Sequence, residues 1–165
     1  MNEINVSNRL GLAVLRGSAV NVEASLRLGP ENSAVESALA TAASLGYADC
    51  LALLIPECDP SAGGSYALRR AVEAGKEECV KMLAPHSDAG EALPMAIRKG
   101  RLGCLELLLP HVRKISGEDH DQLVMLAEIS DVKLGGIMSA FVSKRLLELS
   151  LEPAKRSGKA QSRRL

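Results

Sequence analysis

Cys79-Val-Lys-Met-Leu-Ala-Pro85 is the stretch that decides the fold, because the chain repeats it. The matching stretches are Cys50-Leu-Ala-Leu-Leu-Ile-Pro56 and Cys104-Leu-Glu-Leu-Leu-Leu-Pro110. A glycine precedes each cysteine by four residues, and these glycines are Gly46, Gly75 and Gly100. The N-terminus fits the same frame more loosely through Leu10, Ala13, Gly17 and Val22. Self-similarity of this kind indicates a repeat protein.

Each repeat is predicted to contain two short helices. Leu68, Ala71 and Val72 recur at helical spacing, and Gly75 suits the left-handed position that ends a helix. The second helix is predicted to bury Cys79, Val80, Leu83 and Ala84 and to stop at Pro85. One helix pair cannot bury its own apolar face, so neighbouring repeats must stack into a solenoid.

Composition supports helices and excludes other classes. Three residues are aromatic while 47% are hydrophobic, which favours closely packed helices over a β-sandwich. The chain of 165 residues holds 20 basic and 20 acidic residues, but residues 153–165 carry five basic and no acidic ones. The N-terminus lacks the basic start and apolar stretch of a secretory signal, and no apolar run reaches 18 residues. The sequence therefore predicts a protein of the cytoplasm with no membrane span.

These residues resemble the ankyrin repeat family. The stretches 38–46 and 67–75 are similar to the first helix of that family and its glycine, and Cys79-Val-Lys-Met-Leu is similar to the second helix. The resemblance covers about residues 8–112, and the endings Pro56 to Asp59 and Pro85 to Asp88 resemble divergent bacterial arrays. It implies an all-α helix-turn-helix solenoid of about four repeats with a helical C-terminal cap.

The chain departs from the family pattern in two ways. Tyr66-Ala-Leu-Arg stands where the family has Thr-Pro-Leu-His. The glycines recur at steps of 29, 29 and 25 residues, whereas the family period is about 33. The missing residues belong to the turn between repeats, so the projecting β-hairpin fingers of the family are expected to be truncated or absent.

The frame divides the chain into three parts. Residues 1–112 are predicted to hold the repeats, at about 8–36, 37–65, 66–90 and 91–112. Residues 61–65 and 87–90 are predicted turns between repeats, since they hold Gly, Ser and Asp. Residues 113–152 are interpreted as a degenerate repeat and C-terminal helical cap. Residues 153–165 are predicted to be a basic disordered tail.

Three cysteines, Cys50, Cys79 and Cys104, occupy the same position of successive repeats. Neighbouring helices lie about 8–10 Å apart, whereas a disulfide needs Cα atoms within about 7 Å and zinc needs ligands that converge on one point. The three are therefore predicted to be buried core residues in a reducing compartment. Cys58 does not occupy this position of the repeat. It falls in a turn and is predicted to be an exposed thiol.

No pattern of residues points to catalysis, a cofactor or a metal. His86 and His111 follow the prolines of successive repeats, so they are expected to lie one unit apart rather than to converge. His120 lies in the acidic stretch 118–121, which we interpret as a solvated loop because adjacent side chains point in different directions. The common nucleophile, phosphate-loop and zinc-protease motifs are missing from the sequence. The sequence therefore predicts a protein that is not an enzyme and has no small-molecule substrate.

A binding strip is predicted on the first helices. At 100° per residue, Tyr66, Arg70 and Glu73 fall opposite the core stripe of their helix. Equivalent positions in the neighbouring repeats are Ser37, Thr41 and Ser44 before it, and Glu91, Met95 and Arg98 after it, with Lys99 at the margin. The resemblance implies that this strip is the concave binding surface, and the predicted partner-binding residues are Tyr66, Arg70, Glu73, Met95, Arg98 and Lys99. Each residue taken alone is also compatible with an ordinary polar helix face.

The resemblance implies protein–protein recognition by rigid display, as an adaptor, an inhibitor or a host-directed effector. The implied setting is bacterial or phage-derived, in the cytoplasm or in a host cell if the protein is translocated. The alternative is a nucleic-acid-associated protein that uses the basic tail and the Arg98–Arg101 patch. An enzyme with dispersed catalytic residues is a third possibility, and it predicts a pocket with strongly shifted pKa values.

Overall fold

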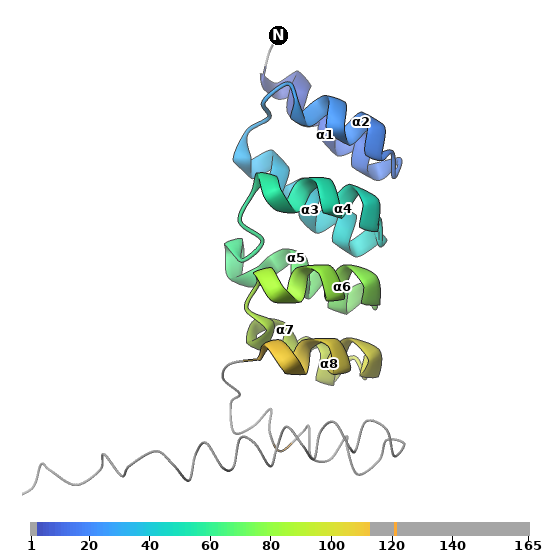
Figure 1. Ribbon diagram of the computed structural model, residues 1–165, viewed down its shortest axis with the longest axis vertical. Helices are drawn as coiled ribbons and strands as arrows, with labels where there is room; N and C mark the ends of the chain where they lie inside the picture. The colour runs from blue at the N-terminus through green and yellow to red at the C-terminus, as the bar shows by residue number, and fades with distance from the viewer. Residues whose placement is uncertain (1–2, 113–120, 122–165) are drawn as a thin grey trace, which may run out of the picture.

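The computed structural model describes residues 3–112 and 121, and this part of the chain forms eight α-helices and no strand. Figure 1 shows them as four helix pairs stacked along one axis. The helices are α1 (Glu3–Leu15), α2 (Ala19–Leu26), α3 (Asn32–Leu45), α4 (Ala48–Leu54), α5 (Ala62–Ala74), α6 (Glu77–Leu83), α7 (Ala89–Arg98) and α8 (Leu102–Leu108). A short 3-10 turn follows α4, α6 and α8, at Ile55–Glu57, Ala84–His86 and Leu109–His111.

The helices form two layers. In the first layer, α1 packs on α3, α3 on α5, and α5 on α7; in the second, α2, α4, α6 and α8 follow one another in the same way. Each unit therefore contacts the units on either side of it along the stack. This is the all-α solenoid that the sequence predicts, and the connections between units within 3–112 contain no β-hairpin.

The prolines of the repeat end each second helix through a 3-10 turn. Pro56, Pro85 and Pro110 each lie at the start of such a turn rather than beyond the helix. A proline is tolerated there because the first residues of a helical turn have no intrahelical acceptor for their N–H groups.

The glycines end the first helices in the left-handed conformation, as the sequence predicts. Gly46 has φ +84° and Gly75 has φ +68°. The residue after each glycine also lays its side chain across the glycine of the preceding unit: a Cβ on Gly46 would lie 2.9 Å from Lys76 Cδ, and one on Gly75 would lie 3.1 Å from Arg101 Cζ. Tyr47 covers Gly17 in the same way. The backbone conformation therefore favours glycine at these positions, and the end of the crossing side chain would have to shift to admit a Cβ.

Gly75→Ala is expected to lower the free energy of unfolding by about 1–2 kcal/mol, because L-residues are strained at positive φ. The Arg101 guanidinium must also move away from the new methyl group. Gly11→Ala is the matched control, since Gly11 lies within α1 and a Cβ there would meet nothing within 4 Å. Alanine at Gly11 should raise stability by up to about 1 kcal/mol. Urea denaturation monitored by circular dichroism measures the free energy of unfolding of both variants. Equal changes in Gly75→Ala and Gly11→Ala would contradict the strain expected at Gly75.

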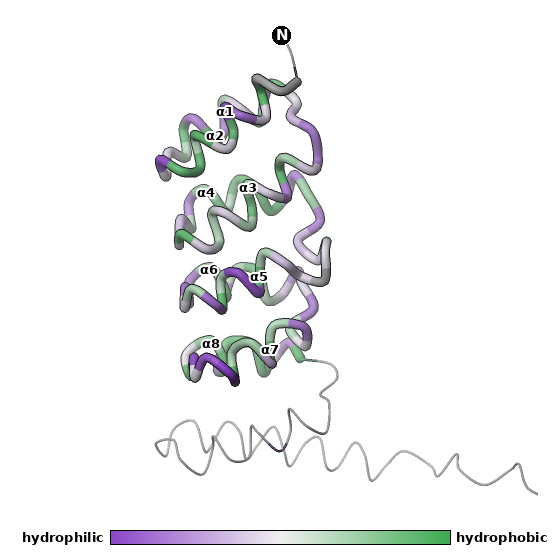
Figure 2. Tube along the Cα trace, turned by 180° about the vertical axis from the view of Figure 1, so that it is seen from behind, coloured by the Kyte–Doolittle hydropathy of each residue, from purple (hydrophilic) through white to green (hydrophobic). Residues whose placement is uncertain are grey.

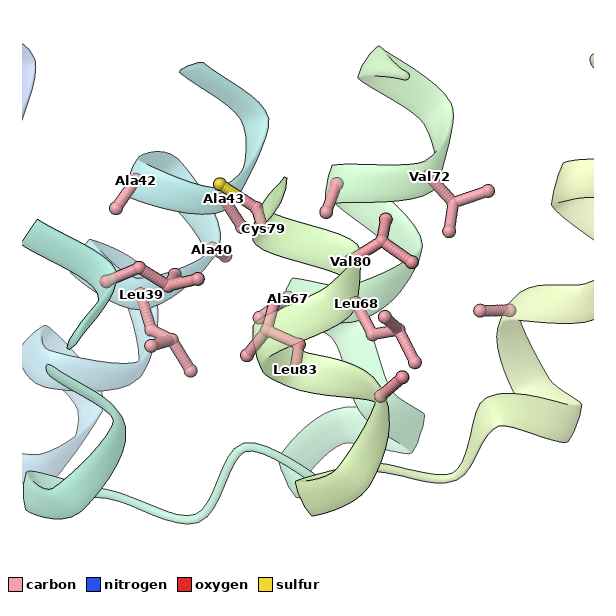
Figure 3. Close-up of a cluster of buried hydrophobic side chains, with 14 of the residues drawn as sticks. Leu39, Ala40, Ala42, Ala43, Ala67, Leu68, Val72, Cys79, Val80 and Leu83 are labelled. Atoms are coloured by element: carbon pink, nitrogen blue, oxygen red, sulfur yellow. The ribbon is translucent and has the colours of Figure 1, made fainter. Parts of the chain in front are cut away.

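The core runs through the whole stack without aromatic side chains. Leu10, Leu39, Leu68 and Leu93 of the first helices are each at most 2% exposed, and so are the alanines one turn later, except Ala13 at 4%. Cys50, Cys79 and Cys104 are buried, which confirms their predicted place in the core. Figure 3 shows Leu39, Ala67 and Leu83 gathered between neighbouring units, and Cys79 pointing toward the preceding unit on the side of Ala43. Small alanines allow the helices to approach closely.

The turns predicted at 61–65 and 87–90 are wrong in part. α5 begins at Ala62 and α7 at Ala89, so residues 62–65 and 89–90 are helical. Asp88 explains the second start, because its carboxylate accepts a hydrogen bond from the Gly90 N–H at 2.9 Å and caps α7. In the first stretch, Ser65 is fully buried, has φ +55°, and accepts the Asp88 N–H at 2.8 Å. A hydrogen bond from the N-cap residue of α7 to the first turn of α5 therefore holds this segment.

The helices cross the unit boundaries that we drew from the sequence. α3, α5 and α7 begin before residues 37, 66 and 91. The division at 8–36, 37–65, 66–90 and 91–112 stays a prediction about the repeat frame. The cap predicted at 113–152 and the tail predicted at 153–165 lie outside the described residues, apart from Asp121, and so does His120.

Candidate functional site

The six predicted binding residues all lie outside the buried core, on the first-helix layer. Tyr66 is 50% exposed. Arg98 and Lys99 are exposed, and Arg70, Glu73 and Met95 are half-buried. Because α3, α5 and α7 stack side by side, equivalent positions on them form continuous rows. We call these rows, from α1 to α7, the first-helix strip.

The middle of the first-helix strip is electrically compensated. Arg70 Nη1 lies 2.8 Å from Glu73 Oε2, one turn apart on α5, and both side chains are about two-fifths exposed. An exposed ion pair of this kind contributes little to stability, about 0–1 kcal/mol. Its consequence here is that α5 presents a hydrogen-bonding surface with little net charge beside Tyr66.

The C-terminal end of the strip is cationic. Arg98, Lys99 and Arg101 surround the turn at Gly100, and all three are exposed. We call them the cationic cluster. No acidic side chain within residues 3–112 forms an ion pair with them, while Arg98 Nη2 lies 3.4 Å from Met95 Sδ. Figure 2 shows the α7–α8 turn as a strongly hydrophilic stretch.

Sequence reasoning missed the N-terminal end of the strip. Leu12 and Leu15 of α1 are 52% and 58% exposed, and Leu45 of α3 is 40% exposed. In the repeat frame Leu12 is equivalent to Arg70, Leu15 to Glu73, and Leu45 to Lys99. We call these three residues the leucine patch. The signal was available, because extending the same rows by one repeat identifies all three.

A groove of about 400 Å³ opens between α3 and the start of α5. The strip residues Ser37 and Tyr66 line it, together with Glu36, Asp59 and apolar atoms of Leu39. Hydrogen bonds from the side chain and backbone of Ser61 lower the pKa of the Asp59 carboxyl. Asp59 is therefore ionised at neutral pH, so the groove adds a recess with negative charge beside Tyr66.

Cys58 is half-buried rather than exposed, so that prediction was wrong. Its thiol donates a hydrogen bond to the Leu54 carbonyl at 3.4 Å, and its side chain packs against the core. Burial, and then the nearby carboxylates of Glu36, Asp59 and Glu57, raise the pKa of the Cys58 thiol to about 11. The 3-10 turn at Ile55–Glu57 folds this residue back onto α4, which its position in the sequence does not reveal.

Cys58 is expected to alkylate slowly in the folded protein. Because its pKa rises from an ordinary 9.0 to about 11, the reactive thiolate at pH 8 is roughly a hundredfold scarcer than for an unperturbed thiol. The measurement is the rate of iodoacetamide labelling at Cys58, resolved by peptide mass spectrometry, with glutathione in the same mixture as the reference. Labelling as fast as glutathione would contradict the buried, acid-flanked thiol.

His86 and His111 lie in the 3-10 turns of successive units, one unit apart as the sequence predicts. Both line one hollow of about 290 Å³, with Ser61, Ser87 and Asp88. Within residues 3–112 and at Asp121, no three His, Cys, Asp or Glu side chains are placed to hold a metal ion.

Comparisons with known proteins give one match. The family model for ankyrin repeats (3 copies) matches residues 10–91 and again residues 39–121, which together span more than half of the chain. No curated protein and no solved structure matched the chain. Among the described helices, none has the length and apolar character to cross a membrane.

Proposed function

The chain belongs to the ankyrin repeat family, and from this premise we propose that it recognises a partner protein through the first-helix strip. Ankyrin repeats are generally protein–protein interaction modules and are typically not enzymes. The proposal therefore concerns which surface binds and how it binds.

One observation carries the proposal: polar and aromatic side chains stand exposed on helices whose opposite sides are fully buried. On α5, Tyr66 is 50% exposed, whereas Leu68, Ala71 and Val72 are 0% exposed. The core thus fixes the backbone that displays the strip. A surface ordered before binding loses little entropy when the partner docks, and Tyr and Arg are enriched at binding hot spots.

We propose a role as an adaptor, an inhibitor or a host-directed effector, since all three act by binding alone. The proposed compartment is a reducing one, the cytoplasm of a bacterium or of its host cell. The four cysteines support this, because all are free thiols and three are buried. The bacterial setting rests on the resemblance of the Pro-x-x-Asp repeat endings to bacterial arrays.

Affinity capture with the full-length chain as bait, followed by mass spectrometry, tests the proposal. A second bait carries Tyr66→Ala, Arg70→Ala, Arg98→Ala and Lys99→Ala. A control bait carries Arg27→Ala and Lys81→Ala, which change exposed cations at the C-terminal end of the outer helix α2 and on the outer helix α6. The partner is expected on the wild-type and control baits and not on the strip bait.

Two results would contradict this assignment. A partner retained by the strip bait and lost from the control bait would place the interface on the outer helices. A nucleic acid that copurifies, with binding that falls steeply as salt rises, would favour the nucleic-acid alternative instead. That alternative has its own support in Arg98, Lys99 and Arg101, which form no ion pair with the acidic side chains described in residues 3–112.

A further inference from the structure

We infer that the two ends of the first-helix strip differ in chemistry, and that the strip binds an extended partner segment. This segment carries apolar side chains at one end and carboxylates at the other. The apolar end of the segment would lie on the leucine patch, and the acidic end would lie on the cationic cluster. This inference rests on the proposed function and gives it a ligand chemistry and a direction.

The leucine patch defines the apolar end. Single exposed leucines are normal on protein surfaces, but Leu12, Leu15 and Leu45 all come from the last turns of α1 and α3, which pack together. Ten other leucines are less than 2% exposed, so this stack has ample room to bury leucine elsewhere. Two exposed cations border the patch, since Arg9 lies one turn before Leu12 on α1 and Arg16 follows Leu15.

The cationic cluster defines the opposite end. Arg98, Lys99 and Arg101 come from within four residues of sequence at the α7–α8 turn, although the Arg101 side chain lies across Gly75 of the preceding unit. The carboxylate of Glu77 reaches the start of α8, where it would collide with a side chain at Gly103. Glu78 is engaged by Lys81 at 3.8 Å, and Glu73 by Arg70 at 2.8 Å. Glu91 lies seven residues before Arg98 on α7, which is about 10 Å along the helix. At the turn itself, Arg98, Lys99 and Arg101 therefore outnumber Glu77, while Glu91 and Glu106 lie farther along α7 and α8, and these cations complement carboxylates.

The distance between the two ends sets the length of the segment. Three helix-to-helix steps separate α1 from α7, and steps of about 8–10 Å give roughly 24–30 Å. An extended chain rises about 3.3 Å per residue, so roughly seven to nine residues span the strip.

The middle of the strip favours an extended segment over a helix. Between the ends lie the hydroxyls of Ser37, Thr41 and Ser44, and the Arg70–Glu73 pair. Thr41 and Ser44 already donate to the carbonyls of Ser37 and Thr41, so their hydroxyl oxygens remain as acceptors for N–H groups. An extended segment exposes its N–H and C=O groups to such partners, whereas a helix satisfies its own. The hydroxyls and the ion pair can therefore serve the main chain of the segment while the two ends select its side chains.

The test is selection of a displayed library of random 12-residue peptides on the immobilised full-length chain. Enriched sequences are then synthesised, and their Kd is measured by fluorescence anisotropy. Two variants address the two ends: Leu12→Ser with Leu15→Ser, and Arg98→Glu with Lys99→Glu. The matched control, Arg27→Glu with Lys81→Glu, makes the same change of charge on the outer helices. Circular dichroism melting confirms that each variant is folded.

We expect selected peptides to carry an apolar group and carboxylates about seven to nine positions apart. Each strip variant should weaken their binding at least tenfold, and the control less than threefold. Peptides with lysines in place of the carboxylates should bind the Arg98→Glu, Lys99→Glu variant better than the wild type. That exchange of charges would identify the acidic end of the segment directly.

Three results would overturn the inference: no peptide is enriched, the enriched peptides lack one of the two features, or neither strip variant changes Kd. In each case, loss of the captured partner from the strip bait would still support the proposed function, so the two failures are distinguishable. A single-stranded oligonucleotide that displaces the peptides and depends on Arg98 and Lys99 but not on the leucines would also overturn it, in favour of nucleic acid.

Discussion

Leu68→Ala is expected to lower the free energy of unfolding by about 2–5 kcal/mol, and Leu83→Ala by a similar amount. Both side chains are 0% exposed. They lie in the third described unit, which packs on neighbours at both sides through α5 and α6. Truncation removes transfer free energy and leaves a cavity that two helix pairs cannot easily close. Urea denaturation monitored by helical circular dichroism measures the loss.

Leu12→Ala is the control for this prediction, because it deletes the same atoms from a side chain that is 52% exposed. Its effect should stay within about 0.5 kcal/mol. Because stability in a stacked array is close to a sum of unit and interface contributions, the unfolding curve of Leu68→Ala is also expected to broaden. Wild-type melting of Leu68→Ala and Leu83→Ala would contradict the stacked core.

Alanine substitutions on the first-helix strip are expected to weaken binding without unfolding the protein. If the strip contacts the partner, Tyr66, Arg70, Arg98 and Lys99 should include one or two hot spots that cost at least about 2 kcal/mol of binding free energy. Arg70→Ala and Arg98→Ala should each change stability by less than about 0.5 kcal/mol, since both side chains face solvent. The measurement is calorimetric titration of the captured partner at two salt concentrations.

Deletion of residues 153–165 is the comparison for this titration. The tail carries five basic residues, whose screened charge should add little affinity at physiological salt. Unchanged binding by the quadruple strip variant, together with loss on deletion of the tail, would favour the charged-tail alternative. Unchanged binding in both would move the interface to the outer helices or to the C-terminal part of the chain.

The repeat period explains why so much of the fold can be predicted from the sequence. Leu68, Ala71 and Val72 recur with the helical period, and a face that recurs in every unit must be the one that the units share. Gly75 could be assigned its positive φ for the same reason, because a helix that ends at a fixed position in each repeat needs a residue without a Cβ there. These inferences concern contacts within a unit or contacts that every unit repeats.

The candidate site could be predicted only in part. Tyr66, Arg70 and Arg98 were identified because they lie opposite the core stripe, which the helical period determines. Leu12, Leu15 and Leu45 were missed, although the same rows contain them, because apolar residues on a helix suggest core until their exposure is known. Cys58 was assigned to the surface, whereas the turn before it folds its thiol inward.

The sequence by itself determined the helix pairs, the buried stripe and the glycine turns of this protein, because periodicity records which side of each helix meets apolar neighbours. The tertiary structure alone decided how particular side chains cross from one unit to the next. Lys76 lies over Gly46, Arg101 over Gly75, and Ser65 accepts the Asp88 N–H. Such contacts join residues that are 23 to 30 positions apart. They depend on the spacing of stacked helices, and no local pattern of residue types encodes that distance.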